Sequence, residues 1–281
     1  MNNMLVFQTD FGLVDGAVSA MYGVALSVDD SLRIFDLTHE IPPFDTFEAS
    51  YRLIQSVPYW PKETTFVSVV DPGVGTKRKS IVAKTISGHY IVTPNNGSLS
   101  HISKTIGIEE VREISEEVGR RDNSSKSNTF HGRDIYAYTG ALLASGKIAF
   151  EDIGNKLPIA EVVVLEDMYP EIKDSEIMGI VETLDVRFGS LWTNISSEDF
   201  EKLDTKIGEN VEVEVLNGNN SVYHSLVKYT STFNEVKIGD PLLYTNSMDH
   251  IGLAINQGNF AKAYNIGTRF PWRIVLRKTN S

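Results

Sequence analysis

The 281-residue chain contains no cysteine, and this absence excludes a disulfide framework, a thiolate metal site and a cysteine nucleophile. Basic residues are scarce: 26 Lys and Arg stand against 37 Asp and Glu, so the formal net charge is −11. A negative net charge argues against binding to the phosphate backbone of a nucleic acid, and we expect no nucleic acid partner. No apolar stretch approaches the roughly 20 residues that cross a bilayer, and the first residues carry no basic signal-peptide region. We therefore expect no membrane association and a soluble protein, with the cytoplasm as its default location.

Familiar catalytic signatures are absent as well. The sequence holds no Walker loop, no G-x-G-x-x-G, no H-E-x-x-H and no G-x-S-x-G. The sequence therefore contains no motif that indicates phosphate binding by a glycine-rich loop, zinc-dependent hydrolysis or an α/β-hydrolase serine nucleophile. The chemistry has to be sought among polar residues at the ends of predicted strands.

The first part of the chain, residues 1–165, alternates short β-branched and apolar runs with helical patterns. The predicted strands are 4–7, 33–37, 65–70, 81–85 and 90–93, and the predicted helices are 17–28, 46–57 and 135–144. This alternation predicts an α/β N-terminal domain with a mostly parallel sheet. Ligands of such sheets bind beyond the carboxyl ends of the strands.

The pattern of apolar and turn-forming residues changes after a predicted linker at about 166–175. From 176 to 281, short apolar runs are separated by Gly, Asn and Asp, which predicts a smaller all-β C-terminal domain. Its predicted strands are 177–184, 190–194, 211–216, 223–229, 242–244 and 251–256. Residues 217–220, Asn-Gly-Asn-Asn, predict a hairpin turn, because Asn and Gly tolerate positive φ.

Acidic residues follow the opening strand. Asp10 lies in Gln-Thr-Asp-Phe-Gly, directly after that strand, and Asp15 precedes the first predicted helix. An acid at the carboxyl edge of a parallel strand suits hydrogen bonding to a ligand diol such as ribose. The alternative is that Asp10 or Asp15 caps the helix.

A second candidate segment, Val-Asp-Pro-Gly-Val-Gly-Thr-Lys-Arg, runs from residue 70 to 78 after another apolar strand. Gly73 and Gly75 allow the backbone to approach a ligand, and Asp71 with Arg78 could form a buried pair. The alternative is an ordinary turn with a surface ion pair worth roughly 0–1 kcal/mol.

A third segment, Phe130-His131-Gly132-Arg133-Asp134, precedes a predicted helix. Of the six histidines, His131 alone is flanked by glycine and ionisable residues. An imidazole can exchange a proton near neutrality, which makes His131 a candidate base. The alternatives are a core or capping histidine, with Asp134 as an N-cap.

In the second half, the stretch from Asp185 to Asn194 combines an acid, the aromatic ring of Phe188 and small polar residues. A flat ring with a few amides suits an adenine base. Such aromatics are more often part of a core, and the amides of 246–247 and 256–259 equally form turns.

Taken together and in order, these segments resemble the S-adenosylmethionine hydrolase (adenosine-forming) family, also called S-adenosylmethionine hydroxide adenosyltransferase. The resemblance extends over essentially the whole chain, and the family is related to fluorinase and chlorinase enzymes. It implies a β-barrel C-terminal domain and a homotrimer with active sites at the subunit interfaces. It also implies that the catalytic set falls on Asp71, Arg78 and His131.

The same resemblance implies contacts with the substrate, S-adenosyl-L-methionine. Asp10 would hold the ribose hydroxyls, Thr76 would lie near the ribose or the reacting carbon, and Phe130 would lie against the adenosine. In the second half, the implied substrate-binding residues are Asp185, Phe188, Ser190, Ser247, Asn256 and Gln257.

Three features of the resemblance favour water over a halide as the nucleophile. The related halogenases have Tyr in place of Asp71 and no histidine in place of His131, and Gly132 stands where fluorinase has a serine. Two positions depart from the family pattern: Ser190 replaces a usual Asn, and Met248 stands where the halogenases have Arg. Both departures weaken the expected hold on the amino-acid end of the substrate.

We therefore predict hydrolysis of S-adenosyl-L-methionine to adenosine and L-methionine at the ribose 5′ carbon, with no cofactor. The sulfonium leaves as a neutral thioether, so the difficulty lies in activating water, whose pKa in bulk is about 15.7. Deprotonation by His131 and a hydroxide held by His131 and Arg78 give the same products, and the residues do not separate them. Two alternatives are a metal-dependent hydrolase using Asp10, Asp71, His131 and Asp134, and a binding module without catalysis.

Overall fold

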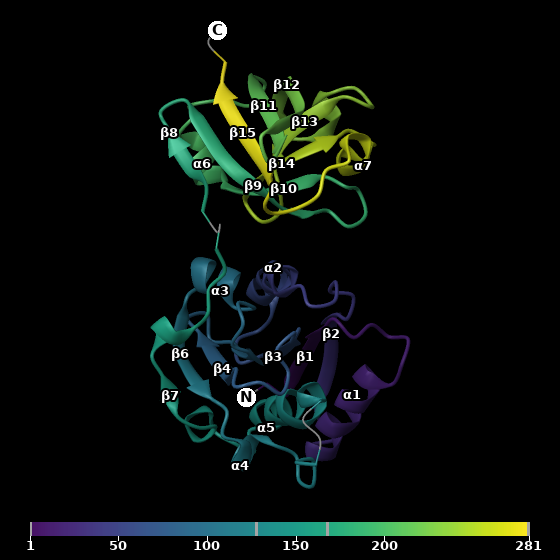
Figure 1. Cartoon of the computed structure of the whole chain (residues 1–281), viewed down its shortest axis with the longest axis vertical. Coiled ribbons are helices and arrows are strands. Elements are labelled where there is room, and N and C mark those ends of the chain that lie inside the picture. The colour runs from purple at the N-terminus through teal and green to yellow at the C-terminus, as the bar shows by residue number, and fades with distance from the viewer. Residues whose placement is uncertain (1, 127–128, 167–168, 280–281) are drawn as a thin grey trace. The chain divides into compact units, whose positions relative to one another are not determined.

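The structure is a computed structural model that describes residues 2–126, 129–166 and 169–279. The chain divides into two compact units, Met1–Glu166 and Asp167–Ser281, each with its own core (Figure 1). None of the helices within the described ranges is long and apolar enough to span a membrane.

The first unit is built on one seven-stranded sheet. Its strands are β1 (Met4–Thr9), β2 (Arg33–Thr38), β3 (Thr65–Val69), β4 (Ser80–Thr85), β5 (Tyr90–Pro94), β6 (Ile108–Glu113) and β7 (Lys156–Leu157). They lie in the order β2-β1-β3-β5-β4-β6-β7. The β2-β1-β3-β5 half is parallel, and the pairs that follow, β5-β4, β4-β6 and β6-β7, are antiparallel.

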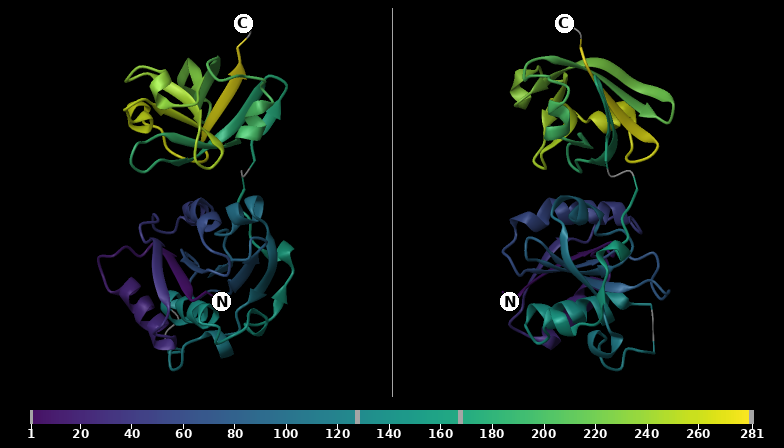
Figure 2. Two further views of the ribbon diagram at one scale, coloured as in Figure 1. Left: turned by 180° about the vertical axis from the view of Figure 1, so that it is seen from behind. Right: turned by 90° about the vertical axis from the view of Figure 1, so that its left-hand side faces the viewer.

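Helices cover both faces of this sheet. They are α1 (Ala17–Val28), α2 (Thr46–Ser56), α3 (Ser100–Thr105), α4 (Glu116–Gly119) and α5 (Tyr138–Ala144), with short turns η1 (Val57–Tyr59), η3 (Phe150–Asp152) and η4 (Ile159–Glu161). A π-helical segment, η2 (Gly132–Ala137), leads into α5. Helices α1 and α5 pack on one face and α2 and α3 on the other (Figures 1 and 2).

The central strands are apolar because both of their faces are covered. Leu5 and Phe7 of β1 and Val67 of β3 are fully buried under α1 and α5. The packing is so close that a Cβ added at Gly140 of α5 would come within 2.3 Å of the Val67 Cγ2 atom. Close contact of α5 with the parallel strands thus fixes the start of that helix relative to their carboxyl ends.

The predicted fold class is confirmed, with one physical difference inside the sheet. Residues 81–85 and 90–93 form an antiparallel hairpin, β4-β5, because Gly88 at φ +86° permits a tight turn between them. Strand β6 was not predicted, since its sequence Ile-Glu-Glu-Val-Arg-Glu is mostly charged. It forms because the antiparallel neighbour β4 supplies its hydrogen bonds and Val111 is buried.

The second unit is a closed barrel. Its strands are β8 (Glu171–Lys173), β9 (Glu176–Leu184), β10 (Leu191–Ser196), β11 (Asn210–Asn217), β12 (Asn220–Thr230), β13 (Pro241–Thr245), β14 (His250–Ile255) and β15 (Trp272–Lys278). Seven of them follow the order β10-β14-β13-β12-β11-β15-β9, and pairing of β9 with β10 closes the ring, with β8 beside β9. Short helical pieces are α6 (Ser197–Glu201), η5 (Phe233–Glu235) and α7 (Phe260–Tyr264).

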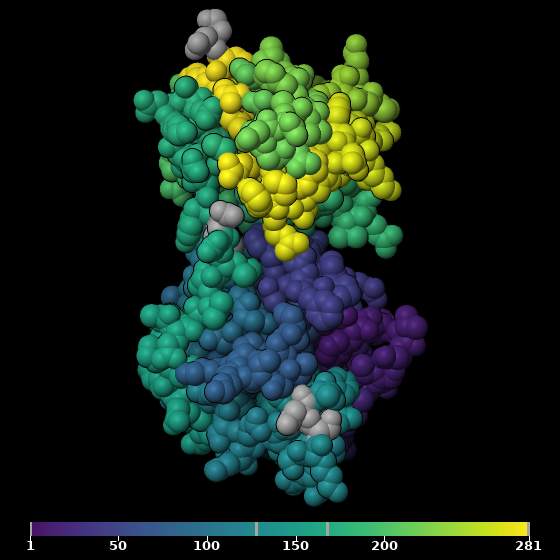
Figure 3. Space-filling view, in the orientation of Figure 1, coloured from purple at the N-terminus to yellow at the C-terminus, as the bar shows by residue number. Residues whose placement is uncertain are grey.

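The turn predicted at 217–220 joins β11 to β12, with Gly218 at φ +62°. The segment 166–175, expected to be a linker, includes residues 167 and 168, which lie outside the described residues, and carries β8 in its remainder. Figure 3 shows the surface of the units; in the first unit, N-terminal residues (purple) and residues near the end of the unit (teal) are both exposed on the side that faces the viewer.

Candidate active site

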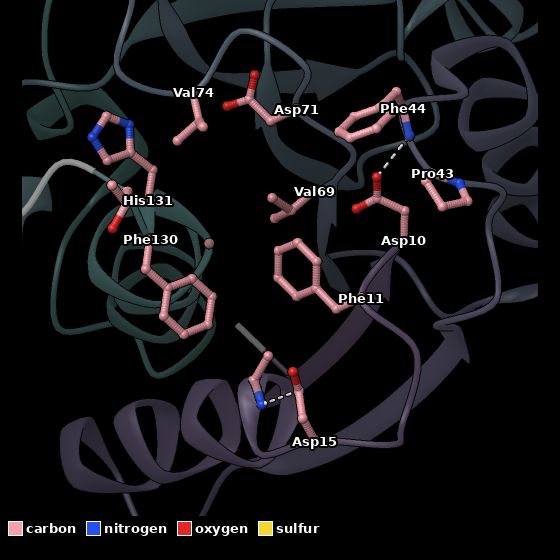
Figure 4. Close-up of a pocket in the computed structure, with 13 residues that line it drawn as sticks. Asp10, Phe11, Asp15, Pro43, Phe44, Val69, Asp71, Val74, Phe130 and His131 are labelled. Atoms are coloured by element: carbon pink, nitrogen blue, oxygen red, sulfur yellow. Dashed lines mark hydrogen bonds between the residues drawn. The ribbon is translucent and has the colours of Figure 1, made fainter.

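A cavity of about 350 Å³ lies in the first unit beyond the carboxyl ends of the parallel strands β1 and β3. Asp10 and Phe11 reach it from the end of β1, Asp71 from the end of β3, and Phe130 and His131 from the residues just before η2 (Figure 4). Four of the predicted site residues, Asp10, Asp71, Phe130 and His131, therefore line one pocket.

Asp10 is held by the neighbouring loop and does not cap α1. Its Oδ2 accepts the Phe44 backbone N–H at 2.9 Å. Burial raises the pKa of Asp10 above its ordinary value, and the Phe44 hydrogen bond opposes that rise. Asp15 lies one residue before the N-cap position, Gly16, which has no side-chain cap; Asp15 Oδ1 accepts the Ala17 N–H, the first of the helix, at 2.9 Å.

Asp71 and Arg78 form a buried ion pair, and the alternative of an exposed surface pair is wrong. Their side chains are 5% and 13% exposed, and Arg78 Nη2 donates to Asp71 Oδ2. Asp71 Oδ1 accepts the Gly73 N–H at 3.1 Å, and Arg78 Nη1 donates to the Lys79 carbonyl at 2.8 Å. A fixed positive charge is thereby positioned beside the pocket with its counter-charge at the pocket wall.

His131 is almost completely buried, at 8% exposure, and one edge of its ring reaches the cavity (Figure 4). Its Nε2 lies 3.4 Å from Arg120 Nη2, and Arg120 Nε also donates to Glu116 Oε2 at 2.8 Å. Burial lowers the pKa of His131 below 6.5, and the positive charge of Arg120 lowers it further. The imidazole is therefore neutral at neutral pH, and because a guanidinium only donates, the lone pair of the ring lies on Nε2 and faces Arg120.

Phe130 forms an aromatic wall with Phe11, the ring centroids being 5.8 Å apart and the planes at 66°. The Arg133 guanidinium lies 5.0 Å from the centroid of the Phe130 ring. Gly132 lies between these rings, and a Cβ there would lie 3.0 Å from the Phe11 Cε2 atom, so a larger residue would displace that ring slightly. The pocket thus has an apolar aromatic wall in addition to its carboxylates.

Asp134, which the sequence left as a helix cap or a metal ligand, is neither. It is buried, and its oxygens accept from Arg133 Nε at 2.8 Å, Arg133 Nη2 at 2.7 Å and Arg121 Nε at 3.1 Å. Burial acts to raise the pKa of Asp134, but these two guanidinium groups lower it overall. Among the described residues, no group of three or more His, Asp and Glu side chains is arranged to hold a metal ion.

Thr76 lies in the turn between Asp71 and Arg78 and is exposed. Its Oγ1 donates to the Gly73 carbonyl at 2.7 Å, and it is absent from the residues that line the cavity. In this structure its hydroxyl stabilises the turn that brings Arg78 back to Asp71.

The second unit has its own pocket, of about 760 Å³, at one end of the barrel. Five predicted residues line it: Asp185, Phe188, Ser190, Asn256 and Gln257. Phe188 is 70% exposed, so the alternative of a core aromatic is wrong for this ring. Asp185 Oδ1 accepts the backbone N–H groups of Arg187 and Phe188, each at 3.0 Å, and this turn presents the ring.

Ser247 is the predicted residue that does not join this pocket. It lies in the turn between β13 and β14, whereas Asn256 follows the opposite end of β14. Its neighbour Asn246 holds that turn, because Asn246 Oδ1 accepts the N–H groups of Met248 at 2.8 Å and His250 at 3.1 Å. For Asn246, the reading as a turn residue is therefore correct.

Sequence reasoning missed three residues around the first pocket: Phe44, Arg120 and Tyr136. Phe44 adopts φ +68°, which is rare for an aromatic residue. The signal in the sequence that could have indicated an irregular loop here is the preceding pair Pro42-Pro43. Tyr136 is fully buried, its hydroxyl lies 2.9 Å from Ser80 Oγ, and burial raises its pKa to about 12. Arg120 had no sign in the sequence, since only folding brings it to His131.

Both units match known protein families. Residues 5–154 match the SAM hydroxide adenosyltransferase N-terminal domain and residues 179–273 match the SAM hydroxide adenosyltransferase C-terminal domain. The chain is 36% identical over 209 residues to a protein of Methanocaldococcus jannaschii named (R)-S-adenosyl-L-methionine hydrolase, a match covering 72% of each chain. It is 28% identical over 287 residues to a fluorinase of Nocardia brasiliensis, covering 94% of this chain and 93% of the relative.

A solved structure from Thermotoga maritima, titled as an uncharacterized conserved protein, is also similar. Its TM-score is 0.88 and its identity 32%, over 98% of this chain and 100% of that chain.

Proposed function

The chain belongs to the SAM hydroxide adenosyltransferase family, and on this premise we propose that it hydrolyses S-adenosyl-L-methionine to adenosine and L-methionine. The observation that carries the proposal is the pocket of the first unit. It brings a neutral buried histidine, His131, to the same cavity as Asp71, whose partner is the buried cation Arg78.

In the proposed reaction, the oxygen of a water molecule attacks the ribose 5′ carbon. The bond between that carbon and the sulfonium sulfur breaks, and its electron pair stays on sulfur, which leaves as the neutral thioether of methionine. The water proton passes to a base, and the new C–O bond completes adenosine. No group needs to protonate the leaving sulfur, so catalysis by the protein consists of activating and orienting the nucleophile.

We assign the nucleophile side to His131 and Arg78. For this, His131 Nε2 exchanges its contact with Arg120 for the attacking water, accepts a hydrogen bond from it and takes its proton. Arg78 stays protonated, so it stabilises the developing hydroxide by its charge and does not act as a base. Asp71 holds the guanidinium in place through the buried pair.

The rest of the pocket supplies binding contacts. We assign the ribose hydroxyls to Asp10, because its carboxylate lines the cavity and its Oδ2 is held by the Phe44 N–H. Phe130 and Phe11 offer an apolar wall to the nucleoside. Thr76 remains proposed near the reacting carbon, which requires its hydroxyl to exchange the Gly73 carbonyl for the substrate.

For the second unit we propose that Asp185 receives the methionine amine, with Phe188, Ser190, Asn256 and Gln257 lining the remaining subsite and Ser247 near the amino-acid end. We also propose a homotrimer with sites at the subunit interfaces, which predicts that separated protomers are inactive. An active monomer, shown by sedimentation and assay at one concentration, would contradict this. The cytoplasmic location stays a prediction, for which cell fractionation is the test.

The test of the reaction is incubation of the purified protein with S-adenosyl-L-methionine in oxygen-18 water, with product analysis by mass spectrometry. Label in the 5′ hydroxyl of adenosine, together with methionine, supports attack at the 5′ carbon. His131→Ala should abolish most of this turnover. His224→Ala, which changes an exposed histidine of the barrel, is the matched control and should retain it.

Two further outcomes separate the alternatives. Turnover lost with EDTA and recovered with one divalent ion would replace the proposal with a metal-dependent hydrolase. Tight adenosine binding with intact S-adenosyl-L-methionine after long incubation would replace it with a binding module.

A further inference from the structure

Two loops that form the wall of the first pocket are joined by backbone hydrogen bonds. The Gly12 N–H donates to the His39 carbonyl at 2.8 Å, and the Ile41 N–H donates to the Thr9 carbonyl at 3.4 Å. One loop follows β1 and carries Asp10 and Phe11, and the other follows β2 and leads to Phe44. The position of Asp10 therefore depends on how firmly these two loops are held together.

A chain of four side chains runs behind the same two loops. The Tyr22 hydroxyl donates to Asp36 Oδ1 at 2.5 Å, and His39 Nε2 lies 3.0 Å from that same oxygen. On the other side of the ring, His39 Nδ1 lies 2.8 Å from Thr9 Oγ1. Thr9 Oγ1 in turn accepts the Phe11 N–H at 3.2 Å, so the chain ends on the backbone of the pocket wall.

The direction of each hydrogen bond follows from its acceptors. An ionised carboxylate only accepts, so the proton of the imidazole must sit on Nε2, facing Asp36. The Nδ1 lone pair then accepts the Thr9 hydroxyl proton, which leaves the Thr9 oxygen free to accept the Phe11 N–H. Burial raises the pKa of Tyr22, and its bond to Asp36 acts in the same direction, so the phenol keeps the proton it donates.

We propose that Tyr22, Asp36, His39 and Thr9 are positioning residues that hold Asp10 and Phe11 in the geometry that receives the nucleoside. Thr9 and His39 are 0% and 3% exposed, so neither contacts substrate, and they act through the loop they fix. That the bound group is a nucleoside rests on the proposed function; the fixing of the loop does not.

The chain contains a matched control for this arrangement at the opposite edge of the sheet. His89, also 3% exposed, has its Nδ1 2.8 Å from Ser87 Oγ and its Nε2 3.0 Å from the Trp60 carbonyl. It lies beside the β4-β5 hairpin, where Tyr90 pairs with Thr65 at the start of β3, away from the pocket at the other end of that strand. Changing His89 thus removes the same kind of buried hydrogen bonds without touching the loops of Asp10.

The experiment compares Thr9→Val, Thr9→Ser, His39→Gln and His89→Gln in the full-length protein. Two quantities are measured: the steady-state KM and kcat for S-adenosyl-L-methionine, and hydrogen exchange of the Phe11 and Gly12 amides. Thr9→Val keeps the shape of the side chain and removes the hydroxyl, and with it the hydrogen bonds to His39 Nδ1 and from the Phe11 N–H. It should raise KM roughly 3- to 10-fold with a smaller change in kcat, as expected for loss of the one of these bonds that holds the pocket wall.

In the same variant both amides should exchange faster, and Thr9→Ser should recover the KM and the slow exchange. His39→Gln should behave like Thr9→Val, whereas His89→Gln should leave KM and both amides unchanged even if it lowers the melting temperature.

Equal KM and exchange in Thr9→Val and Thr9→Ser would overturn the proposal, as would a KM increase in His89→Gln equal to that in His39→Gln. If His39→Gln fails to fold, the Thr9 pair still decides. If the wild type does not turn over S-adenosyl-L-methionine, the proposed function fails, while amide exchange in the Thr9 pair still tests the positioning role.

Discussion

The buried pair of Asp71 and Arg78 allows stability and activity to be separated by mutation. We consider Asp71→Asn, Arg78→Met and the double variant. Each single change leaves one charge, or the polar group that replaced it, without its partner at a site where the side chains are only 5% and 13% exposed. Removing one partner of a buried ion pair costs roughly 3–5 kcal/mol, whereas replacing both is often nearly neutral.

We expect that range to apply to Asp71→Asn. The guanidinium would retain its bond to the Lys79 carbonyl, while its Nε already lacks a hydrogen-bond partner among the described residues. For a unit of about this size, each kcal/mol lowers the melting temperature by roughly 2–4 °C, so we expect a fall of roughly 6–20 °C. The double variant should regain most of that loss, because no uncompensated charge remains.

The assay is calorimetric melting of all three variants, with turnover of S-adenosyl-L-methionine measured on the same samples. Turnover should be lost in all three, since Arg78 supplies the charge beside the nucleophile and Asp71 holds it. Glu109→Gln, which breaks the exposed pair with Lys84, is the control and should cost no more than about 1 kcal/mol. The reasoning is refuted if Asp71→Asn is no less stable than the control, or if the double variant retains turnover.

Three further predictions concern His131 and the packing of α5. His131→Ala should lower kcat by roughly 10²–10⁴-fold with little change in adenosine affinity by calorimetry, and equal losses in both would contradict its role as a base. Because burial and then Arg120 lower the pKa of His131 below 6.5, turnover should persist as the pH falls below 6.5 and be lost only on passing through the lowered value. Stability should also decline below pH 6.5, since the unfolded chain binds that proton more readily; an acid limb of kcat/KM at or above 6.5 would be inconsistent with this. Gly140→Ala should lower the free energy of unfolding by up to roughly 2 kcal/mol, because overpacking against Val67 costs roughly 1–3 kcal/mol and the better helix propensity of Ala offsets about 1 of it; a raised urea midpoint would count against it.

Local patterns in the sequence were enough to predict most helices and strands of the parallel half of the sheet. The helix predicted at 17–28 is α1 (Ala17–Val28), and the predicted strand 65–70 is β3 (Thr65–Val69) within one residue. These elements are determined by apolar periodicity and by the caps beside them, which act over a few residues. The same local reading failed for β6, whose charged sequence forms a strand only because β4 lies beside it.

The candidate site divides in the same way. The sequence placed Asp10 and Asp71 each after a predicted strand, and the family resemblance assigned both to one site; the structure confirms that they line one pocket. Whether Asp71 and Arg78 are buried, and whether His131 is neutral, depended on the surrounding residues and required the tertiary structure.

The contact of Thr9 with His39 spans 30 residues of sequence and forms only when β2 pairs with β1. Burial, pKa and side-chain hydrogen bonding are properties of neighbours in space, and for this protein only the tertiary structure decided them. The sequence by itself determined which chemical groups were present and at which strand ends they would lie.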